Sequence, residues 1–213
     1  MRGIVFDLDG TLLDSMPLVL RMFAHAVSPF VEPLGDERWR SLLGGPPRRI
    51  LEGVLNNPAD AEEALLRLAH FQHEQAKHIA LFTGVKSLLS DLRSAGVITG
   101  IWTGRDRRST QTLIAEHGLG EMLTSCICGD DLTSHKPDSE GLQAVLVQMN
   151  TSPAEALFVG DSPVDVMAGA SLGVKTLWIT HGLDRKRPIE GLAWRVVNTP
   201  IEAYALIRDE YIR

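Results

Sequence analysis

Short apolar runs recur along the chain and alternate with segments whose apolar residues follow helical spacing. Alternation of this kind is typical of a parallel sheet covered by helices. We expect the strands at residues 3–6, 97–102, 126–128, 156–159, 175–179 and 195–197. The pattern therefore predicts an α/β fold with helices on both faces of a parallel sheet.

Two of the predicted helices have clear ends. In residues 84–95, Val85, Leu88, Leu89 and Leu92 fall on one helical face, and Gly96 is a typical stop. The segment from Thr199 through Pro200 to Glu202 has the form of a capping box with proline at the first helical position. It predicts the start of a C-terminal helix.

One region breaks the alternation of strands and helices. From Ser15 to about Ala80 only helical spacing is found, with an apolar stripe at Ala61, Ala64, Leu65, Leu68 and Ala69. A helical block placed after the first strand predicts a small α-helical cap domain. We expect a core of residues 1–14 and 84–213 and a cap of residues 15–83.

Charge and composition narrow the function. The chain has 213 residues, a net charge of -6 and 44% hydrophobic residues. The acidic balance argues against nucleic-acid binding, since the densest basic run, at Arg105, Arg107 and Arg108, is interrupted by Asp106. No apolar stretch is long enough for a membrane span, and no signal peptide is recognised. We expect a cytoplasmic monomer in which Cys126 and Cys128 are small packing residues rather than a disulfide or zinc site.

The first strand ends in two acids, Asp7 and Asp9, followed by Gly10. Ligands of parallel sheets bind beyond the carboxyl ends of the strands. Residues two apart in a strand start on the same face, and two such acids repel unless a cation or a proton intervenes. A turn at Gly10 would aim them at different atoms, one as a nucleophile and the other for proton transfer. The alternative is a pair of surface or helix-capping aspartates.

Two further segments carry candidate phosphate contacts. Thr103 and Gly104 follow an apolar run and offer a hydroxyl and a backbone N–H. Lys136, before Pro137, offers a cation ahead of a helix. Each has an ordinary reading, as turn chemistry for Thr103-Gly104 and as a solvated side chain for Lys136.

A fourth segment again delivers acids at a strand end. Asp161 follows the run at 156–159, and Asp165 falls in the first turn of the helix that Ser162 and Pro163 begin. Asp165 alone could simply oppose the helix dipole. Carboxylates at the ends of two separate strands together suit an oxygen-ligated cation such as Mg²⁺.

Taken together, these segments resemble the haloacid-dehalogenase-like hydrolase superfamily. The run Phe6-Asp7-Leu8-Asp9-Gly10-Thr11 resembles its first motif almost letter for letter. The second to fourth motifs match Thr103, Lys136-Pro137, and Gly160-Asp161-Ser162 with Asp165. The helical insert is similar to the cap of the phosphoglycolate-phosphatase and beta-phosphoglucomutase-like branch, and the resemblance implies a Rossmann-like core.

The resemblance also implies roles. Asp7 would attack phosphorus and become an aspartyl-phosphate, while Asp9 would protonate the leaving alcohol and then activate water. Thr103, Gly104 and Lys136 would hold the phosphoryl oxygens. An acid two residues beyond the nucleophile is a feature of the superfamily's phosphatases, and its dehalogenases and phosphonatases characteristically lack it.

A magnesium ion is the cofactor that the resemblance implies. Asp7, Asp161 and the backbone carbonyl of Asp9 would be its ligands, with Asp165 in the outer shell or bound through water. The chain departs from the family pattern at Ser134-His135 before Lys136 and at Ser139. Neither departure removes a reacting group.

The substrate would be a small phosphorylated metabolite. In the cap, Arg48 and Arg49 follow a Gly-Gly-Pro-Pro loop that loosely resembles the branch's specificity loop, and they either meet an anionic substrate group or are solvated.

Phosphomonoester hydrolysis is the leading function, and two alternatives stay open. A phosphosugar mutase would use the same acids, with a cap that excludes water. His25 in the first cap helix could orient a sugar, although its place beside Phe23 and Val27 suits packing equally. The other alternative is a non-catalytic relative that binds a phosphometabolite.

Overall fold

The computed structural model describes residues 2–42, 47–75, 79–182 and 188–212. The chain divides into two compact units, which we call the sheet unit (Met1–Asp14 with Ala80–Arg213) and the helical unit (Ser15–Ile79). The sequence placed the second boundary at 83/84. The division falls at 79/80 because strand β3 (Ala80–Leu81) pairs with β2 (Leu13–Asp14) and so joins the sheet unit.

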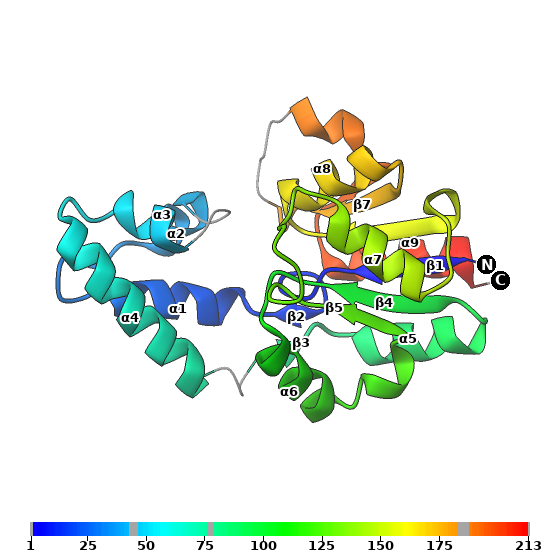
Figure 1. The fold of residues 1–213 in the computed structure, drawn as a ribbon, viewed down its shortest axis with the longest axis horizontal. Coiled ribbons are helices and arrows are strands. Elements are labelled where there is room, and N and C mark those ends of the chain that lie inside the picture. Colours follow the sequence, from blue (N-terminus) through cyan, green and yellow to red (C-terminus); the bar gives the residue numbers. More distant parts are fainter. Residues whose placement is uncertain (1, 43–46, 76–78, 183–187, 213) are drawn as a thin grey trace. The chain divides into compact units, whose positions relative to one another are not determined.

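In the described residues, the sheet unit contains a six-stranded parallel sheet in the order β5-β4-β1-β6-β7-β8 (Figure 1). Each apolar run expected to be a strand forms one, with ends that shift by at most one residue. The strands are β1 (Gly3–Phe6), β4 (Ile98–Trp102), β5 (Ser125–Ile127), β6 (Ala156–Gly160), β7 (Lys175–Ile179) and β8 (Arg195–Val197).

The strand order determines which strand ends lie next to each other. From β1 the chain goes to β4 and β5 on one side and then to β6, β7 and β8 on the other. The carboxyl ends of β4, β1 and β6 are therefore neighbours at the point where the order reverses, which is where open α/β sheets bind ligands. The segments that follow these three strands carry Thr103, Asp7 and Asp161.

Helices cover both faces of the sheet, as the sequence predicted. Helices α7 (Glu140–Gln148) and α8 (Pro163–Leu172) pack on one face, and α5 (Val85–Ser94) and α9 (Pro200–Tyr211) on the other. A further helix, α6 (Arg107–His117), follows β4. The apolar stripe predicted for α5 is fully buried at Val85, Leu88, Leu89 and Leu92.

The predicted start of α9 is confirmed, with one difference. Thr199 accepts a hydrogen bond from the backbone N–H of Glu202 at 3.3 Å. The Glu202 carboxylate accepts from the N–H of Asn198 at 2.8 Å rather than from that of Thr199. The hydrogen bond from the glutamate side of the capping box therefore moves one residue toward the N-terminus, and the side chains of Thr199 and Glu202 both still accept a backbone hydrogen bond.

The helical unit has its own core. It contains α1 (Met16–Val27), α2 (Asp36–Leu42), α3 (Pro47–Glu52) and α4 (Pro58–Gln75). Phe23 and Trp39 pack with ring centroids 5.6 Å apart, and Ala61, Ala64 and Leu68 close the core from α4. The predicted stripe on α4 is narrower than expected, because Ala69 is exposed.

Three smaller expectations can be compared with the structure. His25 does not pack inside like Phe23 and Val27; it is exposed, and its ring lies 4.9 Å from that of Phe71. Cys126 and Cys128 are free thiols, with Cys128 buried and Cys126 partly so. None of the helices in the described ranges has the length and apolar character needed to cross a membrane.

Candidate active site

Asp7 is the first residue after the central strand. Its backbone N–H donates to the carbonyl of Val159 in β6 at 2.8 Å, so the residue continues the pairing of β1 with β6. Its side chain lies among the strand ends, and the residue is only 7% exposed. A carboxylate this deep needs partners for its charge.

The chain turns sharply after Asp7. The N–H groups of Leu12 and Leu13 both donate to the carbonyl of Leu8, which closes a tight loop. Gly10 has a φ of 76°, and a Cβ there would lie 2.3 Å from a carboxylate oxygen of Asp161. The predicted turn at Gly10 is confirmed, and only glycine permits both the left-handed backbone and the close approach of Asp161.

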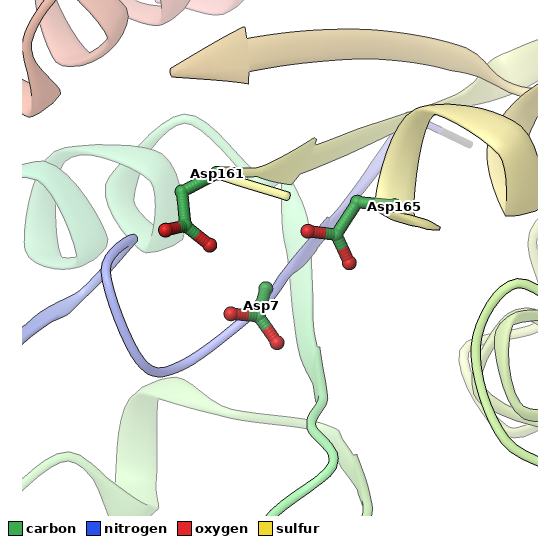
Figure 2. A group of neighbouring side chains, drawn as sticks. All are labelled: Asp7, Asp161 and Asp165. Carbon is green, nitrogen blue, oxygen red and sulfur yellow. The ribbon is translucent and has the colours of Figure 1, made fainter. Parts of the chain in front are cut away.

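Asp161 and Asp165 reach the same place from β6 and α8. Asp165 Oδ2 accepts from the N–H of Ser162 at 2.9 Å, which ties the first turn of α8 to the end of β6. A Cβ at Gly160 would lie 2.5 Å from the Asp165 carboxyl carbon, so the small residue makes room for this carboxylate. Ligand atoms of Asp7, Asp161 and Asp165 all lie within 4.8 Å of one another around a shared space (Figure 2).

Lys136 joins the same cluster. Its Nζ lies 2.6 Å from Asp7 Oδ1 and 2.8 Å from Asp165 Oδ1. The ammonium also lies 4.8 Å from the ring centroid of Trp102 and 5.3 Å from that of Phe158. The two rings exclude water on one side while the two carboxylates fix the charge on the other. Lys136 is thus a held cation and not the solvated side chain that a lone lysine usually is.

Charge is not balanced in this cluster. The pKa of Asp7 is raised to about 7, chiefly by burial and also by Asp165 and Asp9, against the opposing effect of Lys136. Burial alone would lower the pKa of Lys136, but Asp165 and Asp7 outweigh it, so the net shift is upward. One ammonium therefore serves two nearby carboxylates, with Asp161 beside them. An additional cation would relieve the repulsion.

The donor set fits magnesium. The three side chains offer carboxylate oxygens, the ligands that this hard cation prefers. Gly10 and Gly160 leave space for Asp161 and Asp165 where any side chain would collide. The carboxylate of Asp9, expected beside that of Asp7, is turned to Arg105 and does not belong to this group.

Thr103 and Gly104 lie at the adjacent strand end. The N–H of Thr103 donates to the carbonyl of Ile127 at 3.0 Å, which carries the β4–β5 pairing one residue further. Thr103 is almost fully buried, and its Oγ1 accepts from the N–H of Arg105 at 3.2 Å. Its hydroxyl hydrogen can still be donated to an oxygen in the site.

Two residues of the site were missed by the sequence analysis. Arg105 had been counted in the basic run, but its guanidinium makes a two-bond ion pair with Asp9, at 2.9 and 2.6 Å. His181 places Nε2 2.7 Å from the carbonyl oxygen of Gly10 and 3.9 Å from Asp161. Its ring stacks on Phe82 at 5.7 Å. The available signal was position, since Arg105 lies three residues beyond the end of β4 and His181 lies two residues beyond the end of β7.

The two arginines of the helical unit have different surroundings. Arg48 forms an ion pair with Glu62 on α4 and lies 3.9 Å from Glu52. Arg49 is exposed on α3. The loop at 43–46 that precedes them lies outside the described residues. The structure thus gives Arg48 a partner within its own unit and leaves the role of Arg49 as a prediction.

Comparison with known proteins agrees with this geometry. Residues 4–179 match the family model described as haloacid dehalogenase-like hydrolase. The chain is 31% identical to an N-acetylmuramic acid 6-phosphate phosphatase of Pseudomonas putida, over 97% of this chain and 96% of that protein. It is 35% identical to a phosphoglycolate phosphatase of the same organism, over 89% and 73%. The fold is similar to that of a haloacid dehalogenase-like hydrolase from Streptococcus pneumoniae, with a TM-score of 0.83, 21% identity, and 97% and 98% coverage.

Proposed function

Because the chain belongs to the haloacid dehalogenase-like hydrolase family, we propose that it hydrolyses phosphate monoesters of small metabolites. The observation that carries the proposal is the cluster of Asp7, Asp161 and Asp165 around Lys136 at the strand ends. A dianionic phosphoryl group needs compensating positive charge and a nucleophile in line with the leaving oxygen. This cluster supplies a nucleophile, a fixed ammonium and a place for a cation.

In the proposed reaction, an Asp7 oxygen attacks phosphorus as the bond to the leaving oxygen breaks. Asp9 gives its proton to that oxygen, and the alcohol departs. Asp9, now ionised, takes a proton from a water molecule that attacks the aspartyl-phosphate. Inorganic phosphate leaves and Asp7 is regenerated.

The other side chains bind and orient the phosphoryl group. Lys136 already holds Asp7 through Oδ1 and would also meet a phosphoryl oxygen. The Thr103 hydroxyl and the backbone N–H of Gly104 would hold other oxygens of the same group. Such fixed donors lower the barrier because they need no reorientation as charge moves.

Magnesium completes the proposal. Asp7 and Asp161 would hold the ion, with the backbone carbonyl of Asp9, and Asp165 would lie behind them or bind through water. When bound, the ion would offset the carboxylate charge and polarise the phosphoryl oxygens. The pKa of Asp7 is raised, chiefly by burial, so the ionised form that a nucleophile needs is costly. A cation bound nearby would favour that ionised form.

The helical unit would act as a cap that selects the substrate, with Arg48 and Arg49 as candidate contacts for an anionic group. The two Pseudomonas putida relatives are named for sugar-acid and glycolate phosphates. We therefore expect a small phosphorylated acid or sugar, handled by one chain acting as a monomer.

A panel of phosphorylated metabolites assayed with Mg²⁺ tests the function. It should include 2-phosphoglycolate, N-acetylmuramic acid 6-phosphate, pyrophosphate and hexose phosphates. We expect release of inorganic phosphate from at least one of them, and none from an Asp7→Asn variant purified in parallel. An isomerised sugar phosphate without phosphate release would favour the mutase. Tight binding without turnover would favour a non-catalytic relative.

A further inference from the structure

Arg105 lies beside Asp9, although no step of the proposed reaction involves it directly. Its Nε lies 2.9 Å from Asp9 Oδ2 and its Nη2 lies 2.6 Å from Asp9 Oδ1. The arginine side chain is 8% exposed and that of Asp9 33%. The guanidinium thus supports, from inside the protein, a carboxylate whose other side remains open to the site.

The backbone of Arg105 is itself held. Its N–H donates to Thr103 Oγ1 at 3.2 Å, and its carbonyl accepts from the N–H of Gly129 at 2.8 Å. A Cβ at Gly129 would lie 2.2 Å from the carbonyl oxygen of Gly104, so the loop after β5 approaches this closely only because residue 129 is glycine. The backbone of Arg105 is therefore hydrogen-bonded to the segments that follow β4 and β5. Its guanidinium in turn fixes the position of the Asp9 carboxylate.

The guanidinium of Arg105 is directed to Asp9. Two of its five N–H groups donate to Asp9. The third nitrogen, Nη1, is buried and has no hydrogen-bond partner among the residues that the structure describes. A buried ion pair with an unsatisfied donor also adds little to stability. These facts point to an effect on the reaction that passes through Asp9.

We propose that Arg105 is a positioning residue that holds the Asp9 carboxylate in the orientation needed for proton transfer. This inference rests on the proposed function. A two-bond fork fixes the plane of the carboxylate as well as its position. It engages one lone pair on each oxygen, so the outward position of Asp9 can carry the proton that goes to the leaving oxygen and, once ionised, can accept a proton from the attacking water. A single-bonded partner would leave the carboxylate free to rotate.

The test compares a good leaving group with a poor one. p-Nitrophenyl phosphate needs little protonation of its leaving oxygen, whereas 2-phosphoglycolate, an alkyl phosphate, depends on it. Arg105→Gln should lower kcat for 2-phosphoglycolate by about tenfold or more, since acid–base assistance is worth ~10²–10⁴-fold and loose positioning forfeits part of it. The rate of Asp7 phosphorylation by p-nitrophenyl phosphate should change by less than about threefold, because that step needs little proton transfer. Arg105→Lys should fall between wild type and Arg105→Gln, because it keeps the charge and loses the fork.

The Asp9→Asn background gives the sharpest comparison. If Arg105 acts only through Asp9, adding Arg105→Gln to Asp9→Asn should cause no further loss with either substrate. Arg208→Gln is the matched control, since Arg208 pairs with Asp91 at 3.0 Å in the same unit and away from the strand ends. It should leave both substrates unaffected.

Equal losses with the two substrates, or a full additional loss in the Asp9→Asn background, would overturn the proposal and make Arg105 a direct ligand or a structural residue. The Asp9→Asn single variant separates this failure from that of the proposed function. If that variant shows no selective loss with 2-phosphoglycolate, the role of Asp9 itself is wrong, and the inference falls with it. Circular dichroism checks the fold, and Arg105→Lys carries the test if Arg105→Gln does not fold.

Discussion

Replacing Asp7 with asparagine is expected to stabilise the protein in the absence of divalent metal, and to do so only above a certain pH. Asp7 is buried, and it shares the ammonium of Lys136 with Asp165. Asparagine has nearly the same shape and carries no charge. The substitution therefore removes the cost of an ionised buried carboxylate and leaves Lys136 paired with Asp165.

The magnitude follows from the pKa of Asp7, which is raised from 3.8 to about 7 by burial and by neighbouring carboxylates. Below about pH 4 the residue is protonated in both the folded and unfolded states and costs nothing. Between about pH 4 and pH 7 only the folded state keeps the proton, so the free energy of unfolding falls as pH rises. Each pKa unit corresponds to about 1.4 kcal/mol, so the full cost above pH 7 is at most about 4 kcal/mol.

Urea denaturation of both proteins in chelator, at pH 4 and pH 8, measures the effect. The free energy of unfolding of Asp7→Asn relative to wild type should rise by about 2–4 kcal/mol between the two pH values. Mg²⁺ should then stabilise wild type more than the variant at pH 8, because a cation favours the ionised carboxylate. A difference that is the same at both pH values would refute the account of Asp7 as a charge held at a cost.

Two further predictions concern the metal and the helical unit. Chelation should abolish turnover and Mg²⁺ should restore it. Ca²⁺ should inhibit, because its larger and looser coordination shell spoils the in-line geometry. Steady-state rates in metal-buffered solution measure these effects, and full activity in excess chelator would contradict the prediction. Exchanging Arg48 and Arg49 together for alanine should raise KM for the best metabolite severalfold and leave p-nitrophenyl phosphate nearly unchanged. Equal effects on both substrates, or none, would assign these arginines to the helical unit's own surface, where Arg48 already pairs with Glu62.

Much of the sheet unit could be predicted from the sequence, because its signals are local. Strands buried on both faces are continuous apolar runs, and each run ended within one residue of the end of its strand. The β2–β3 pair could not be predicted, because strands of two residues carry no periodicity. Its absence from the prediction is also why the expected domain boundary fell after Ala80 rather than before it.

The candidate site was less predictable than the fold. Asp7, Asp161 and Asp165 follow strand ends that the sheet order brings together, and their proximity was foreseeable. The direction of Asp9 was not, since it depends on a loop closed by backbone bonds to Leu8. The pairing of Arg105 was not predictable either, because its partner Asp9 lies 96 residues away in the sequence.

The central claim is that Asp7 is phosphorylated during turnover, and trapping that intermediate tests it most directly. Asp9→Asn keeps the nucleophile but cannot activate water, so the phosphorylated enzyme should accumulate with p-nitrophenyl phosphate and Mg²⁺. Rapid quenching followed by intact-mass and peptide mass spectrometry should find one added phosphoryl group on Asp7 in this variant and little in wild type. A variant that turns over p-nitrophenyl phosphate with no adduct at any time, or with the adduct on another residue, would contradict the account.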